Sequence, residues 1–166
     1  MSKDIENYDL LKILHRAKYL SSSNVQILEQ YLRRWSMSAY QAILKTQLLT
    51  ESDLADALAS SLELERIRLI CNMNILPATL SILTFREARM WECIALERRN
   101  LEDKSFLKLV VTDPTKIRFF SILRERTGCD ILCAVGERSD ILRAINEFYS
   151  IEDQLPSLHS SNPFIE

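Results

Sequence analysis

The sequence predicts an α+β protein, in which an all-helical part of two helical hairpins precedes a small α/β part with a mixed sheet of about three strands. Apolar residues recur at helical spacing through the first 62 residues, and β-prone runs alternate with helical segments after them. The chain of 166 residues has only 2 Gly and 4 Pro, too few for a barrel or sandwich with many tight turns. We therefore expect a helical part at residues 1–62, an α/β part at 63–150, and a tail or linker at 151–166.

Four helices are expected in the helical part. In the first pair, Leu11 and Leu14 belong to an apolar stripe, and the run 21–24 supplies capping residues for the next helix. In the second pair, Thr50 and Asp53 have the spacing of a capping box at the start of the last helix. The remaining stripes are formed by Val25, Leu28, Leu32, Ala39, Ile43, Leu44, Leu54, Ala57 and Leu58.

The two hairpins resemble each other at a spacing of 29 residues. Ala17–Val25 aligns with Thr46–Leu54, since each segment has a helix end, an apolar pair, a hydroxyl cap, a polar triplet and an apolar anchor. This pattern indicates two copies of one hairpin unit whose apolar faces cover each other. The alternative is that any two capped amphipathic helices look alike.

The α/β part begins with short helices and ends with a longer one. Pro77 can open a helix, because proline has no N–H to lose at the first helical position, and Asp113-Pro114 gives the same signal further on. Gly128 supplies a C-cap, and the order of elements implies a right-handed crossover between parallel strands. The expected elements are helices from Pro77, over Phe85–Met90, over Pro114–Arg126 (burying Ile117, Phe120 and Leu123) and over Glu137–Tyr149, with strands over Trp91–Leu96, Phe106–Val111 and Cys129–Val135.

Composition and charge exclude several classes of function. The chain has 21 Lys+Arg against 23 Asp+Glu, and basic pairs such as Arg98-Arg99 have acidic neighbours, so we expect no nucleic-acid partner. Two glycines cannot build a P-loop or a dinucleotide-binding fingerprint. Neither a carboxylate pair nor a serine with a base has a recognisable catalytic spacing. We therefore expect no enzymatic activity and no cofactor.

The cysteines and histidines do not predict a metal site. Cys129 and Cys133 share strand parity, but structural zinc takes four ligands at close spacings, and the two histidines, His15 and His159, lie elsewhere in the chain. The first residues lack the apolar run of a secretory signal, so we expect a cytoplasmic protein with reduced thiols. The most apolar window, 67–85, contains polar residues and a proline, so we expect no transmembrane segment.

A string of motifs in the α/β part carries a family resemblance. Leu107–Pro114 reads LKLVVTDP, Thr127–Ile131 reads TGCDI, and the last helix ends in Phe148-Tyr149. Together with Leu83–Arg89 and Ile94–Arg98, this string resembles the N-terminal domain of the type II secretion and type IV pilus assembly ATPases. The resemblance implies either docking on a cytoplasmic membrane-platform protein or binding of cyclic di-GMP. We expect no ATP hydrolysis, because the chain has no GxxxxGK[ST] motif. A further interpretation is that the chain is the N-terminal piece of a longer ATPase.

Members of that family that bind cyclic di-GMP carry tandem segments of the form RLGxxLVxxGxxxxxxLxxxLxxQ. The resemblance implies that the arginine contacts guanine and that the glycines let the backbone approach the ligand. The second segment here, Ser38–Ser61, has Ser38 at the arginine, Tyr40 and Gln47 at the glycines, Ser61 at the glutamine, and keeps Leu48, Leu49, Leu54 and Leu58. The first segment, Asp9–Leu32, has Asp9 at the arginine, Leu11 and Lys18 at the glycines, and Leu32 at the glutamine.

Every polar recognition position of the motif is thus replaced in both copies. We expect a non-catalytic protein-interaction or regulatory module that docks a protein partner of a secretion- or pilus-type machinery, at the inner face of the membrane but without inserting into it. The alternative is a cyclic di-GMP receptor with a divergent motif, in a shifted register or with compensating basic residues. The candidate binding residues for these two functions are Lys12, Arg16, Trp35, Ser38, Tyr40, Gln47, Leu48, Leu49, Leu54 and Leu58, with Lys18 and Lys45 as further compensating cations.

Trp35, Met37 and Tyr40 are apolar at the joint between the two hairpins, where a polar segment is usual. The simpler interpretation is that they pack between the hairpins. The alternative is an exposed aromatic anchor for a partner, because aromatic side chains contribute much of the binding energy of protein interfaces.

Overall fold

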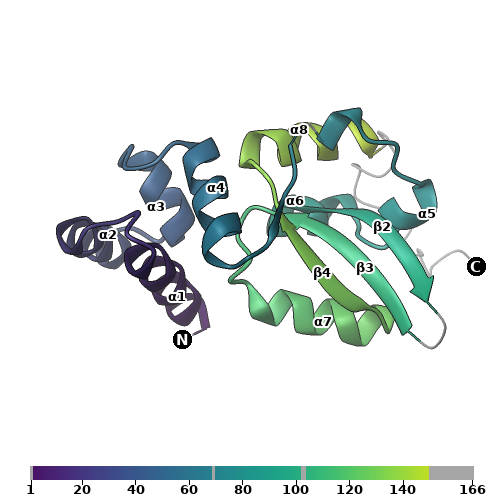
Figure 1. Ribbon diagram of the computed structural model, residues 1–166, viewed down its shortest axis with the longest axis horizontal. Helices are drawn as coiled ribbons and strands as arrows, with labels where there is room; N and C mark the ends of the chain where they lie inside the picture. The colour runs from purple at the N-terminus through teal and green to yellow at the C-terminus, as the bar shows by residue number, and fades with distance from the viewer. Residues whose placement is uncertain (1, 69, 102–103, 150–166) are drawn as a thin grey trace, which may run out of the picture.

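Four helices are followed along the chain by a layer of strands and further helices (Figure 1). The computed structural model describes residues 2–68, 70–101 and 104–149, with side chains from Asp9 onward. The tail or linker predicted at 151–166 lies outside these residues. The α+β class predicted from the sequence is confirmed. The helical part consists of α1 (Ser2–Arg16), α2 (Ser22–Arg34), α3 (Ala39–Lys45) and α4 (Glu51–Ser61).

The strand-containing part has four strands, in the order β1-β4-β3-β2 across the sheet. β2 and β3 are antiparallel, whereas β4 runs parallel to both β3 and β1. Its elements are β1 (Glu65–Arg66), η1 (Ile70–Asn72), α5 (Pro77–Leu80), α6 (Phe85–Trp91), β2 (Cys93–Leu101), β3 (Lys104–Val111), α7 (Ile117–Thr127), β4 (Asp130–Val135) and α8 (Arg138–Phe148).

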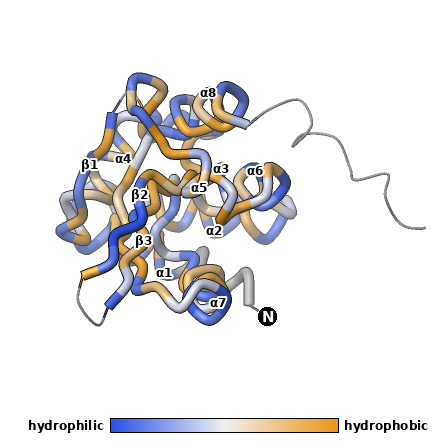
Figure 2. Tube along the Cα trace, turned by 90° about the vertical axis from the view of Figure 1, so that its right-hand side faces the viewer, coloured by the Kyte–Doolittle hydropathy of each residue, from blue (hydrophilic) through white to orange (hydrophobic). Residues whose placement is uncertain are grey.

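Two strands differ from the sequence prediction. β1, which makes the sheet four-stranded, has only two residues, too few to produce an alternating pattern. β2 begins after Trp91, because Glu92 adopts a left-handed conformation (φ 49°) that ends α6. It continues through the charged stretch beyond Leu96, where the predicted strand ends, since this stretch of an edge strand faces solvent and tolerates charges. Figure 2 shows this outer stretch of β2 as hydrophilic.

The start of α7 also differs from the prediction. The carboxylate of Asp113 accepts hydrogen bonds from the Thr115 N–H (3.0 Å) and hydroxyl (2.6 Å), so it closes a turn instead of capping a helix at Pro114. The helix therefore begins three residues later, and a different stripe faces the sheet. Ile117, expected in the core, is 66% exposed. Phe119 and Leu123 are buried instead, and Phe120 is half-buried.

Three caps begin helices of the two hairpins; those at Ser21 and Thr50 were expected from the sequence, whereas the capping box of α3 was not. The Ser21 hydroxyl accepts from the Asn24 N–H, and the Thr50 hydroxyl accepts from the Asp53 N–H, both at 3.1 Å. A capping box opens α3, where Ser38 and Gln41 each accept from the other's backbone N–H at 3.2 Å.

The turns inside the two hairpins have the same backbone hydrogen bonds, 29 residues apart. The Tyr19 N–H donates to the Leu14 carbonyl (2.9 Å), and the Leu48 N–H donates to the Ile43 carbonyl (3.3 Å). The preceding residues, Lys18 and Gln47, are both left-handed, with φ of 66° and 55°. This geometric repeat supports the two-copy interpretation of the sequence.

Glycine in place of Gln47 is expected to raise the free energy of unfolding by about 0.5–1 kcal/mol, because a left-handed side chain costs about 1–2 kcal/mol, partly offset by the greater freedom of glycine in the unfolded chain. Urea denaturation measures the change. Gln47→Ala is the matched control, because alanine retains the left-handed strain. Equal stability of the glycine and alanine variants would contradict this account of the turn.

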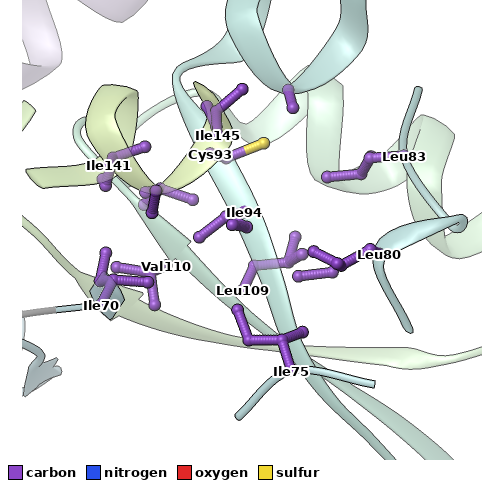
Figure 3. Packing of buried hydrophobic residues seen from close by; sticks show 14 of the residues in the cluster. Ile70, Ile75, Leu80, Leu83, Cys93, Ile94, Leu109, Val110, Ile141 and Ile145 are labelled. Atoms are coloured by element: carbon purple, nitrogen blue, oxygen red, sulfur yellow. The ribbon is translucent and has the colours of Figure 1, made fainter. Parts of the chain in front are cut away.

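Two clusters of buried residues form the core, one in each part. In Figure 1, α7 lies on one side of the sheet, and α8 lies on the other with α5 and α6. Figure 3 shows Ile141 and Ile145 of α8 above Ile94 and Val110 of the sheet. Val135, at the end of β4, belongs to the helical cluster, so the helices pack directly on the strand end. Within the described residues, no helix has the length and hydropathy needed to cross a membrane.

Candidate functional site

Tyr40 fills the first glycine position of the second motif copy. Its side chain is only 2% exposed, and its hydroxyl has no hydrogen-bond partner in the structure. Burial raises the pKa of the Tyr40 phenol well above its ordinary value, and the carboxylates of Glu51 and Glu92 raise it further. The phenol is therefore neutral, and the space that a glycine would leave for a ligand is occupied.

Leu11 occupies the same position in the first copy and is 1% exposed. Both glycine positions that open the motif are thus filled by large buried side chains. Asp9, at the arginine position of this copy, is partly exposed, and Leu32, at its glutamine position, is half-buried. The first copy therefore offers a carboxylate and apolar carbon where the motif has its polar recognition groups.

Ser38, at the arginine position of the second copy, is engaged in a helix cap. The Ser38 hydroxyl accepts from the Gln41 N–H, so it closes the capping box of α3. At the glutamine position, the Ser61 hydroxyl is buried and has no hydrogen-bond partner among the described residues. Neither short side chain presents a planar group that could stack on a base or donate two hydrogen bonds to it.

The apolar candidates belong to the core of the helical part. Leu54 and Leu58 are fully buried, and Leu48 and Leu49 are half-buried against the same cluster. Gln47 is exposed at the left-handed turn position. The backbone shape of the motif is therefore kept, and its apolar anchors hold the hairpins together.

The basic candidates lie on the surface of the helical part. Lys12, Arg16, Lys18 and Lys45 are all exposed. None of them takes part in an ion pair among the described side chains. None of them lines the three clefts of about 380, 310 and 560 Å³ formed by described residues of the strand-containing part.

Two long-range hydrogen bonds that the sequence did not reveal lie around Tyr40, and the first of them joins the helical part to α8. The Glu51 carboxylate accepts from the Ser139 N–H at 2.9 Å. Arg138 donates to Glu92 at 2.7 Å. These pairs are separated by 88 and 46 residues in the chain, so no local pattern could have indicated them.

Arg66 of β1 is the centre of a second bridge in this junction. It donates to Asp56 of α4 and to Glu137 at the start of α8, both at 2.7 Å, and is mostly buried. Arg68 also binds Asp56 and lowers the pKa of that carboxyl together with Arg66, against the opposing effect of burial. A cleft of about 560 Å³ beside this bridge is lined by Arg66, Arg68, Glu137, Ser139, Asp140 and Arg143.

The charges around this cleft are balanced. Arg66 and Arg68 are paired as described, and Arg143 donates to Asp140 at 2.6 Å. Because each arginine already has a carboxylate partner, the cleft has no excess positive charge to attract an anion.

Trp35 is the C-cap residue of α2 and is 50% exposed. The guanidinium carbon of Arg34 and the ammonium of Lys45 lie 5.8 and 5.7 Å from its ring centroid. Met37 is half-buried. The predicted packing between hairpins is therefore wrong for Trp35 and holds for Tyr40.

The cysteines are free thiols in the structure. Cys129 is buried, and burial raises the pKa of Cys93 to about 12 and that of Cys133 to about 11, so these two thiols are not ready metal ligands. The described residues contain no group of three or more His, Cys, Asp and Glu arranged to hold a metal ion.

Comparison with known proteins identifies the family. A family model described as the MshEN domain matches residues 70–155, more than half of the chain. A structure of MshE with cdg is similar at 14% identity and a TM-score of 0.68, covering 84% of this chain and 98% of that one. The N-terminal domain of XpsE is similar at 20% identity and a TM-score of 0.68, covering 87% of this chain and 96% of that one.

Among curated proteins, no sequence matches this chain at a significant level. The fold and the family match confirm the resemblance to the N-terminal domains of secretion and pilus ATPases. The chain belongs to the MshEN domain family.

Proposed function

We propose that this chain is a non-catalytic docking module that binds a protein partner of a secretion- or pilus-type machinery. The observation that carries the proposal is the filling of both opening glycine positions of the tandem motif, by Leu11 and Tyr40. Backbone cannot approach a dinucleotide where these side chains stand. A fold kept without its ligand-contacting residues is suited to the other activity that the family resemblance implies, which is docking to a protein.

A cyclic di-GMP receptor is the second candidate. The left-handed backbone at Lys18 and Gln47 favours it, since the turns keep the shape that glycines would give. The similarity to MshE with cdg also favours it. Against it stand the carboxylate of Asp9, which repels phosphate, and the engagement of Ser38 in a helix cap.

Isothermal titration with cyclic di-GMP separates the two candidates. We expect no saturable heat, and the N-terminal domain of MshE titrated under the same conditions is the positive control. In parallel, affinity capture from a lysate with the tagged chain should recover a protein partner that an excess of cyclic di-GMP does not release. Saturable binding of the dinucleotide at micromolar concentrations would contradict the proposed function.

A further inference from the structure

Trp35 follows the C-terminal end of a face of α2 that carries two partly exposed apolar residues and an arginine. Ile27, Tyr31 and Arg34 are spaced at i, i+4 and i+7, so they lie along one face of this helix. Ile27 is 49% exposed and Tyr31 is half-buried. We call Ile27, Tyr31, Arg34, Trp35 and Lys45 the tryptophan surface.

Among the side chains that the structure describes, no carboxylate pairs with the cations of the tryptophan surface. No ion pair among the described side chains includes Arg34, Lys45 or the neighbouring Arg33. Arg66, Arg126 and Arg138, by contrast, are all paired with carboxylates. Positive charge beside a half-exposed indole is therefore available to a ligand that brings carboxylates.

We propose that the tryptophan surface docks an acidic segment of a protein partner, with an apolar side chain of that segment against the Trp35 ring and its carboxylates on Arg34 and Lys45. This inference rests on the proposed function and names the surface and the chemistry of the partner. Tryptophan and arginine are the residues that most often dominate binding energy when a partner removes them from water. The surrounding charges determine orientation and association rate.

An acidic protein segment fits this surface better than an anionic membrane does. Attraction to anionic lipid takes clusters of about 4–8 basic residues. The tryptophan surface has two cations over the ring, with Arg33 as a neighbour in the last turn of α2. One exposed indole and one exposed isoleucine also give little apolar area for insertion into a bilayer.

A displayed library of random dodecapeptides is the probe for this inference. We expect selection on the intact chain to enrich peptides with several Asp or Glu residues next to an apolar residue. Their affinity should fall about tenfold or more for Trp35→Ala and for Lys45→Glu. It should be unchanged for Leu132→Ala, a matched control that is also 50% exposed but lies on β4. Circular dichroism and the urea midpoint check that each variant is folded.

Tryptophan fluorescence gives a second readout. The chain has 2 Trp, and Trp91 stacks on Phe119, so Trp91→Phe leaves Trp35 as the sole reporter. Binding of a selected peptide should shift its emission to shorter wavelength, and added salt should weaken the binding. A failed selection, peptides without acidic residues, or peptides that bind Trp35→Ala equally well overturn the inference. Phosphatidylserine vesicles that bind the wild type and not Trp35→Ala overturn it in favour of a lipid.

The surface and the proposed function can fail separately. Micromolar binding of cyclic di-GMP rejects the proposed function whatever the peptides show. If the dinucleotide does not bind, and the partner captured by the wild type is captured equally by Trp35→Ala, the docking function stands and only the assignment of this surface is rejected.

Discussion

Replacement of Tyr40 by glycine is expected to lower the free energy of unfolding by about 4–6 kcal/mol. Truncation of a buried aromatic side chain costs about 3–5 kcal/mol, and glycine inside a helix costs about 1 kcal/mol more than alanine. Tyr40 is 2% exposed and lies within α3, so both costs apply. Urea denaturation monitored by circular dichroism measures the loss. A loss below about 1 kcal/mol would mean that the ring does not fill the site.

Tyr40→Phe is the matched control for this prediction. It keeps the ring and removes a buried hydroxyl that has no partner among the described residues, so stability should rise by about 1 kcal/mol. Because the folded-state pKa is raised above the ordinary value of 10.0, the wild type should also lose stability as the pH rises past that value. The phenylalanine variant should lack this loss. Destabilisation of Tyr40→Phe would show that the hydroxyl does have a partner.

Replacement of Gly136 by alanine is expected to cost about 2–3 kcal/mol, because the added methyl group overpacks the core. Its Cβ would lie 2.6 Å from Cγ1 of Val110 and 3.0 Å from Cδ1 of Ile141. Valine is β-branched and stiff, so it cannot swing aside. Denaturation of the single and double variants in a cycle with Val110→Ala should reveal a coupling that relieves part of the loss.

The other glycine of the chain is the control. Gly128 is left-handed (φ 66°), and a Cβ there would meet no atom within 4 Å. Gly128→Ala should therefore cost about 1 kcal/mol through backbone strain alone. Val110→Ala should not alter that cost. The steric explanation would be refuted if Val110→Ala restored stability to Gly128→Ala. It would also be refuted if Val110→Ala restored none of the stability lost by Gly136→Ala.

The helical part could be predicted well because its signals are local. Ser21 and Thr50 have the position of capping residues immediately before helices, and each forms its cap in the structure. The start of α7 was misplaced because Asp113 satisfies Thr115 by a local turn that competes with capping. The two-residue strand β1 could not be predicted, since its existence depends on the distant Ala134 and Val135.

The site was predictable only in part. Sequence comparison with the motif located Ser38 and Tyr40 and showed that they depart from it, but it could not say whether the departures leave space for a ligand. Burial of Tyr40 shows that its ring fills the glycine position, and burial depends on packing across the whole junction. The sequence also could not decide between packing and exposure of Trp35, because exposure depends on where α2 ends relative to α3 and not on residue type.

The salt bridges of Arg66 are among the contacts that hold the four helices against the sheet. This side chain ties Asp56 in α4 to Glu137 at the start of α8, and the Glu51 bond to Ser139 runs beside it. A force applied to the four helices is transmitted to the sheet through these hydrogen bonds as well as through the connecting chain. The helices move away from the sheet only if these bridges and the Val135 contact break together. A partner that binds the helical part and moves it therefore moves the strand-containing part as well.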